Sequence, residues 1–492
     1  MLVSATNELQ TIDMTTSRKI LGFSKDTIIY GIGDGLGKLV ALVMLPILSR
    51  VFIPSEYGII DLLTVSYTFI LFISRLGISS GIQRYYYLRS EEYSKRMISS
   101  TVFFIIPIQC LLTLCLITFA IPLSNLLPDS SNKQLSIIIL ALCLPVEQML
   151  NFLVLLLRLD RMPAFFSAAN IARIIITPLL TYILVVPLNK GIPGVFMAKI
   201  IALALITGCL MFVLRKKFTT KINFKIFKEV FLFSFPGFPG LLIKQILPLL
   251  PRYLLALYSP MAAVGLFGIA FRVASTMKLY VTSFNRAWNP FAYSNAGSPD
   301  EKKLYEIVFK YFGASLIIFC TTLSLFAKEV ITVLTPEKYH SAYTLVPGIS
   351  MYFGIEGLIL VLSTILYTNE KVIWTSYLNI IQIIIFFISG FILIPVYNAA
   401  GVVAAMDISM VLYFLLYLMI SLKTFYFHAS KAKLCALVLI ASIAIIIFNA
   451  FSNLNLIALK FLFLVLLFLL TIFFIPTRTE RSKLRQFIPG IS

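Results

Sequence analysis

Long apolar runs separated by short polar connections extend along almost the whole chain. A helix needs about 20 apolar residues to cross the hydrocarbon core of a bilayer, because each residue adds roughly 1.5 Å. By this measure the sequence predicts fourteen membrane-spanning helices. They are expected at residues 25–49, 57–83, 98–122, 134–157, 163–187, 192–214, 229–256, 261–293, 305–327, 341–367, 372–396, 400–422, 432–452 and 455–475.

The polar connections are strongly asymmetric in charge. Connections on one side of the predicted membrane carry 25 Lys and Arg residues, and those on the other side carry five. Basic residues concentrate in cytoplasmic connections, so both termini are expected in the cytoplasm. This asymmetry also accounts for most of the net charge of +20, and nucleic-acid binding is not needed to explain it.

The second half of the chain repeats the first at a nearly constant offset. Leu157–Ile175 aligns with Leu366–Ile384 at an offset of 209, and Gly194–Val195 matches Gly401–Val402 at 207. Spans 1–6 and 7–12 would then share one orientation and form two lobes related by a pseudo-two-fold axis along the membrane normal. Two equal lobes with a cleft between them form the geometry of alternating access.

The expected organisation follows from these spans. It comprises a cytoplasmic N-terminal tail (1–24), an N-lobe of six spans (25–214), a basic cytoplasmic linker (215–228), a C-lobe of six spans (229–422), a further helix pair (423–476) and a cytoplasmic C-terminal tail (477–492).

Composition supports a membrane protein and excludes several other classes. Hydrophobic residues make up 59% and charged residues 13% of the chain, whereas soluble domains carry about 25% charged residues. The six cysteines lie in apolar runs and there are only two histidines, so neither a disulfide framework nor a metal site is expected. The connections on the side opposite the basic ones are short, and no soluble catalytic domain is inserted.

Charged residues inside the predicted spans are the candidate functional groups. A basic residue at the bilayer centre costs about 2.5–3.5 kcal/mol on insertion scales, so most should face a partner or a water-filled cavity. The nine basic residues are Lys38, Arg75, Arg173, Lys199, Lys244, Arg252, Arg272, Lys278 and Arg286. The five acids are Asp34, Asp61, Glu147, Glu356 and Asp407.

Between Val230 and Pro299, a segment that covers nearly all of spans 7 and 8, the chain has five basic residues and no acid. Lys244 and Arg252 are eight residues apart and share a helix face. One interpretation pairs these cations with Glu356 or Asp407 from other spans. The other is a cavity for a phosphate-bearing substrate, because arginine matches phosphate oxygens in a bidentate manner.

Two segments near the N-terminus carry a family resemblance. The segment Asp26-Thr-Ile-Ile-Tyr-Gly-Ile-Gly33 is followed by Pro46-Ile-Leu-Ser-Arg-Val-Phe-Ile-Pro-Ser-Glu-Tyr-Gly58. Together they resemble the opening of bacterial oligosaccharide flippases, which export O-antigen or capsule repeat units. These belong to the polysaccharide transporter family, in the superfamily that includes multidrug-and-toxin extrusion (MATE) transporters. The resemblance covers essentially the whole chain.

The resemblance implies an all-α, MATE-like fold and a flippase rather than an enzyme. Its substrate would be an undecaprenyl-pyrophosphate-linked oligosaccharide, moved from the cytoplasmic to the periplasmic leaflet of the bacterial inner membrane, in O-antigen and lipopolysaccharide biosynthesis. A polysaccharide polymerase and chain-length machinery are the implied partners. The head group would contact a cationic cavity formed by Lys38, Arg75, Lys244, Arg252, Arg272 and Lys278.

Two other functions remain open at this point. An ion-coupled MATE-type exporter of small molecules would share the fold, although exporters of cations need acids that the segment from Val230 to Pro299 lacks. A membrane polysaccharide polymerase or glycosyltransferase would need a larger external loop. No cofactor is expected, but coupling to H⁺ or Na⁺ would require an intramembrane carboxylate. The candidates for coupling or gating are Asp34, Glu147, Glu356 and Asp407.

Overall fold

The fold is built from α-helices and short 3₁₀ helices. A computed structural model describes residues 43–125, 133–425, 431–450 and 457–474, and no β-strand occurs within these ranges. Contacts group the chain into two compact units. The first contains the described residues up to Val51 together with Leu63–Ile246, and the second contains Phe52–Leu62 and the described residues from Leu247 onward.

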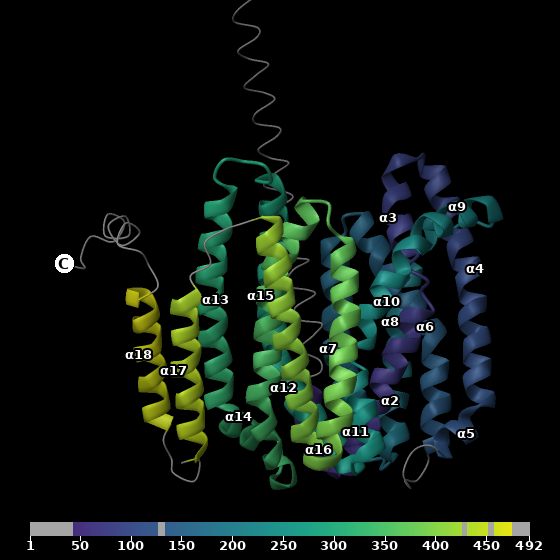
Figure 1. The fold of residues 1–492 in the computed structure, drawn as a ribbon. Coiled ribbons are helices and arrows are strands. Elements are labelled where there is room, and N and C mark those ends of the chain that lie inside the picture. The colour runs from purple at the N-terminus through teal and green to yellow at the C-terminus, as the bar shows by residue number, and fades with distance from the viewer. Residues whose placement is uncertain (1–42, 126–132, 426–430, 451–456, 475–492) are drawn as a thin grey trace, which may run out of the picture. The chain divides into compact units, whose positions relative to one another are not determined.

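The first unit is a bundle of long helices with short connecting elements (Figure 1). Its helices are α2 (Pro54–Ile73, of which the part from Leu63 belongs here), α3 (Ser79–Leu88), α4 (Glu91–Thr118), α5 (Ala120–Asn125), α6 (Lys133–Leu159), α7 (Pro163–Val185), α8 (Gly191–Leu214), η1 (Arg215–Lys217), α9 (Phe224–Ser234), η2 (Phe235–Gly237) and α10 (Phe238–Ile246).

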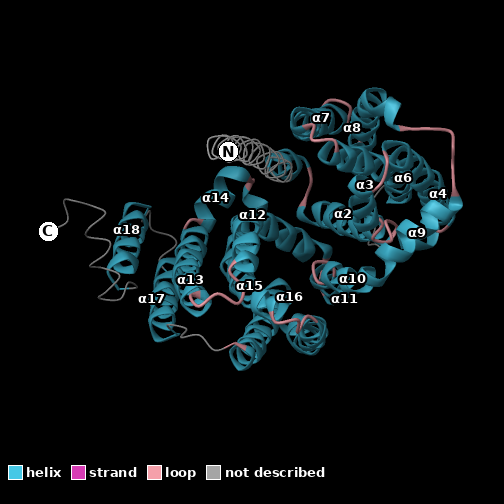
Figure 2. Ribbon diagram, turned by 90° about the horizontal axis from the view of Figure 1, so that it is seen from above, coloured by secondary structure: helices cyan, strands magenta, loops and turns pink. Residues whose placement is uncertain are grey.

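The second unit contains the remaining helices and the first turns of α2. These helices are α11 (Leu250–Tyr258), α12 (Met261–Ser294), α13 (Glu301–Leu325), α14 (Ala327–Leu334), η3 (Glu337–Leu345), α15 (Val346–Thr368), α16 (Ile373–Thr424), α17 (Lys431–Ala450) and α18 (Ile457–Phe474). Figure 2 shows the long helices of each unit end-on, which is the arrangement of a helical bundle.

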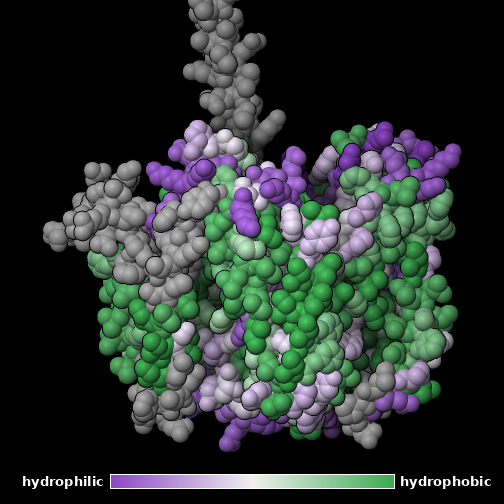
Figure 3. All heavy atoms as spheres, in the orientation of Figure 1, coloured by the Kyte–Doolittle hydropathy of each residue, from purple (hydrophilic) through white to green (hydrophobic). Residues whose placement is uncertain are grey.

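Nine helices of the described residues are long and apolar enough to cross a membrane, so the chain is a multi-pass membrane protein. Hydrophobic side chains cover the length of these helices and hydrophilic ones gather toward their ends (Figure 3). Helix α16 spans 52 residues but joins two helices at Asn398, whose φ is 49°, and it covers the two spans expected at 372–396 and 400–422. The expected span 229–256 is broken into α9, η2, α10 and α11.

The internal repeat is present in the backbone itself. Arg161 and Glu370 both have a left-handed backbone, with φ of 53° and 57°, and are 209 residues apart. The next amide in each copy closes the same turn: Met162 donates to the Leu157 carbonyl and Lys371 to the Leu366 carbonyl, both at 2.8 Å. Equivalent helix ends therefore stop with the same hydrogen-bonded motif, which confirms the predicted duplication over α6–α7 and α15–α16.

Two glycines allow α2 and α12 to cross closely in the second unit. A Cβ atom on Gly58 would lie 2.2 Å from the Met261 carbonyl oxygen, and one on Gly265 would lie 2.0 Å from the Pro54 carbonyl oxygen. Any side chain at either position would collide with backbone. Small residues at helix crossings are the usual means by which membrane helices approach closely.

Candidate functional site

The structure describes most, but not all, of the side chains predicted to form the site. Lys38 and Asp34 lie outside the described residues, and so does the side chain of Lys244. The remaining predicted residues divide between the two units. Glu147 and Arg75 belong to the first unit, and Arg252, Arg272, Lys278, Glu356 and Asp407 belong to the second.

Glu147 is the centre of a polar cluster in the first unit. Helix α6 places this carboxylate among its buried residues, and its side chain is only 9% exposed. Arg173 from α7 donates to Oε1, while the Lys199 ammonium from α8 lies 3.0 Å from Oε2. Tyr67 from α2 donates its hydroxyl to Oε2 at 2.7 Å. Three helices thus supply partners to one carboxylate, as a buried charge requires.

Aromatic contact adds to this cluster. The Lys199 ammonium lies 3.7 Å from the centroid of the Tyr67 ring, within the range of a cation–π interaction. Lys199 and Tyr67 are therefore held both by Glu147 and by each other, and such a doubly restrained cation has little freedom to change rotamer.

Arg75 adds a third basic group in the first unit. It lies in the turn after α2, which is formed by Leu76 and Gly77 with φ of 51° and 69°. Its Nε is buried and has no hydrogen-bond partner among the described residues. The charge of Glu147 acts on Arg75, but no ion pair of the described chain joins the two. Among the described residues around Glu147, three basic groups thus accompany one carboxylate, an excess of two positive charges.

Asp61 provides the counter-charge for two arginines in the second unit. Arg252 donates through Nε to Asp61 Oδ2 at 2.6 Å, and the two side chains are 4% and 5% exposed. Arg272 approaches Oδ1 of the same carboxylate at 3.6 Å.

Arg252 and Arg272 have further partners in the same unit. Nη1 of Arg252 donates to the Pro248 carbonyl at 2.8 Å, and its guanidinium lies 4.3 Å from the centroid of the Phe271 ring. The guanidinium of Arg272 lies 5.0 Å from the centroid of the Tyr57 ring. Arg252 therefore forms a structural ion pair with Asp61 in this conformation. Together with Arg272, the three side chains form a group with one net positive charge.

Sequence reasoning did not assign Asp61 as this partner. It considered Glu356 and Asp407 as counter-ions for spans 7 and 8, but the acid comes from α2, 191 residues before Arg252. Arg173 and Lys199 were identified only as intramembrane charges, without a role. Their signal in the sequence is the same as that of the other intramembrane basic residues, and only the packing of α6, α7 and α8 brings them together.

Lys278 and Glu356 are the more exposed of the predicted residues of the second unit. The Lys278 ammonium lies 4.0 Å from Glu356 Oε1, and the two side chains are 45% and 38% exposed. Asp407 has a buried Oδ1 without a hydrogen-bond partner in the described part of the chain. Within that part no group of three or more His, Cys, Asp or Glu residues could hold a metal ion.

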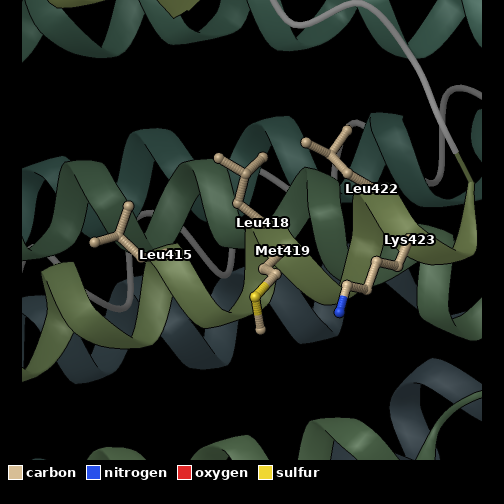
Figure 4. Close-up of a pocket in the computed structure, with 5 residues that line it drawn as sticks. All are labelled: Leu415, Leu418, Met419, Leu422 and Lys423. Carbon is tan, nitrogen blue, oxygen red and sulfur yellow. The ribbon is translucent and has the colours of Figure 1, made fainter.

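One surface hollow of about 390 Å³ is lined by a single helix and does not meet any of these clusters (Figure 4). Its side chains are Leu415, Leu418, Met419, Leu422 and Lys423, all of α16. Four apolar side chains with a lysine near the helix end are typical of a lipid-facing surface, where the ammonium extends toward water.

Known proteins share both sequence features and the fold of this chain. Residues 23–295 match the family model described as polysaccharide biosynthesis protein. No curated protein sequence matches the chain. The solved structures that it resembles include a lipid II flippase, MurJ, in an inward closed conformation. That comparison has a TM-score of 0.71 and 15% identity, and covers 94% of this chain and 99% of MurJ.

Two multidrug transporters show the same fold. An inward-facing MATE family transporter of the MOP superfamily has a TM-score of 0.65 and 13% identity, covering 79% of this chain and 95% of its own. The MATE transporter DinF-BH has a TM-score of 0.57 and 19% identity, covering 83% and 97%. These likenesses confirm the predicted all-α, MATE-like fold, and each of the three solved proteins is described as a flippase or a transporter. The chain belongs to the polysaccharide biosynthesis protein family.

Proposed function

We propose that this protein is a flippase for undecaprenyl-pyrophosphate-linked oligosaccharide repeat units. It would move them from the cytoplasmic to the periplasmic leaflet of the bacterial inner membrane by alternating access between the lobes at 25–214 and 229–422. The product would supply O-antigen or related surface polysaccharide, with a polymerase and chain-length machinery acting next. Family membership and the MurJ-like fold support a lipid-linked substrate.

The observation that carries this proposal is the excess of positive charge around Glu147. Arg173 and Lys199 are held by that carboxylate, whereas no ion pair joins Arg75 to a carboxylate of the described residues, and its buried Nε has no partner among them. An uncompensated guanidinium inside a membrane bundle is costly unless an anion or water neutralises it. A pyrophosphate offers several acceptor oxygens, which a guanidinium binds through paired hydrogen bonds.

The second unit supplies the other proposed contacts. Arg272 and Lys278 are incompletely neutralised by Asp61 and Glu356, so both can contribute to an anionic head-group site. Lys38 and Lys244 remain proposed contacts on sequence grounds. Arg252 is less suited to bind the substrate in this conformation, because its guanidinium is already engaged by Asp61 and Pro248.

Arg75→Gln is the sharpest test of this function. No ion pair joins Arg75 to another described residue, so its replacement should leave the fold intact while removing a proposed phosphate ligand. A hydrogen bond to a charged group contributes about 1.5–3 kcal/mol, so the variant should bind the substrate roughly 10- to 150-fold more weakly.

The assay is restoration of surface polysaccharide in a strain that lacks its own repeat-unit flippase, at matched membrane abundance. The control pair is Lys302→Gln and Lys303→Gln, two exposed lysines in the first turn of α13. Normal activity of Arg75→Gln would contradict the proposed head-group site. Export of small cationic compounds by the wild type, without restoration of polysaccharide in any strain tested, would favour a MATE-type exporter.

A further inference from the structure

The two repeats differ in charge at equivalent positions. Glu147 and Arg173 correspond to Glu356 and Gln382, each 209 residues later. Lys199 corresponds, within one residue, to Asp407, because the offset shortens to 207 at Gly194 and Gly401. The first repeat therefore joins one acid to two cations, whereas the second places two acids and an amide at the matching positions.

Asp407 is the exceptional carboxylate of the described spans. Asp61, Glu147 and Glu329 each have a basic partner within 3.0 Å. Asp407 has no ion pair or hydrogen bond in the described part of the chain, and its Oδ1 is buried. Its other oxygen faces Gly348 of α15, where an added Cβ would lie only 2.8 Å from Oδ2. The glycine thus makes room for a carboxyl group that no described residue neutralises.

The described groups near Asp407 do not supply a positive charge. The charge of Asp407 acts on Tyr352 of α15 and on Cys320 of α13, and Glu356 lies four residues after Tyr352 on the same face of α15. Lys278 of α12 lies 4.0 Å from Glu356 Oε1, and no ion pair joins it to Asp407. An ionised Asp407 would therefore be a buried negative charge without a compensating cation among the described residues.

An unpaired ionised carboxylate in an apolar interior costs several kcal/mol, and protonation removes that cost. From this geometry we propose that Asp407 is a proton-binding site of the second repeat. The proton comes from water, forms an O–H bond on the carboxyl group, and returns to water when the site becomes hydrated. Proton binding stands on the geometry alone, whereas its coupling to substrate movement rests on the proposed function.

Infrared spectroscopy of the purified full-length protein in lipid nanodiscs tests proton binding without any substrate. Aspartate labelled with ¹³C at the side-chain carboxyl shifts the carbonyl band of protonated Asp away from that of Glu. We expect a protonated-Asp band at neutral pH in the wild type that is absent from Asp407→Asn. The matched control Asp300→Asn alters an exposed aspartate at the start of α13 and should leave the band unchanged.

Each outcome of the infrared experiment either supports or overturns proton binding at Asp407. Persistence of the whole band in Asp407→Asn would overturn the proposal, as would its absence from the wild type. If Asp407→Asn fails to fold, Asp407→Glu gives the same information, because the neutral-pH band should move out of the labelled aspartate region. Loss of the wild-type band when sodium replaces choline at constant pH would reassign the ligand to Na⁺ and overturn a proton-only site.

A second readout addresses coupling. If Asp407 carries the coupled proton, Asp407→Asn should make polysaccharide export insensitive to an ionophore that collapses the pH gradient, while the wild type slows. Wild-type export that is equally insensitive would overturn the coupling step alone. Failure of all variants and the wild type to export would count against the proposed function and leave the spectroscopic result standing.

Discussion

The guanidinium of Arg252 and the carboxylate of Asp61 form a buried ion pair, with Nε of Arg252 2.6 Å from Oδ2 of Asp61. Both side chains are almost fully buried, and Arg272 shares the same carboxylate at 3.6 Å. This contact links the beginning of α2 to α11 and α12 within the second unit. It gives a shared counter-charge to two of the cations predicted as head-group contacts.

Removing Asp61 should therefore destabilise the second unit strongly. Asp61→Asn leaves Arg252 and Arg272 buried without a counter-charge, and breaking such a pair costs about 3–5 kcal/mol. Thermal unfolding of the protein in nanodiscs measures the loss. A double-mutant cycle with Arg252→Gln should show strong coupling between the two sites, and additive effects would contradict the ion pair.

The close crossing of α2 and α12 predicts that replacing a glycine by alanine changes stability very differently at the crossing and away from it. Gly265→Ala places a methyl group about where the Pro54 carbonyl oxygen lies, so the helices must separate, at a cost of about 1–3 kcal/mol or more. Gly208 of α8 has nothing within 4 Å of an added Cβ. Gly208→Ala should be neutral or stabilising by up to about 1 kcal/mol, because alanine favours the helix. Unfolding midpoints of the two variants provide the comparison.

Glu370, which lies just after α15, has a left-handed backbone conformation that favours glycine at this position. Glu370 has φ of 57°, a conformation that costs a non-glycine residue roughly 1–2 kcal/mol. Glu370→Gly should raise the free energy of unfolding by up to about 1 kcal/mol, and Glu370→Ala, which keeps the Cβ, should not. Arg161→Gly should behave in the same way, because Arg161 occupies the equivalent turn. A loss of stability in both glycine variants would show that these side chains contribute more than the backbone strain costs.

The charge asymmetry of the connections predicts the orientation of the chain. In a variant without native cysteines, Lys216→Cys should react with an impermeant maleimide only after the membrane is permeabilised. Lys190→Cys, on the opposite connection, should react in intact cells once the outer membrane is opened. Both residues are exposed, so differences in labelling report the side of the membrane. The reverse pattern would place the termini outside the cytoplasm.

Much of the fold follows from the sequence. Helix length, apolar runs and turn residues are local properties, so they place α6, α7, α8, α12 and α13 close to the expected spans. The duplication is also visible without a structure, since an offset of 209 joins Leu157–Ile175 to Leu366–Ile384. That offset recurs in the left-handed turns at Arg161 and Glu370. The Pro and Gly residues of Pro236–Gly240 indicate a break in the span expected at 229–256. The sequence does not indicate that this span divides into α9, η2, α10 and α11.

The order of residues is enough to predict that this chain crosses a membrane many times, repeats its helices and carries more intramembrane cations than acids. Which of these charges have partners depends on the packing of the helices. Asp61 rather than Glu356 or Asp407 neutralises Arg252. Glu147 restrains Arg173 and Lys199, whereas no ion pair joins Arg75 to a carboxylate within the described ranges. Hydrophobic periodicity fixes the face of a single helix, whereas an ion pair across 191 residues depends on how several helices pack together.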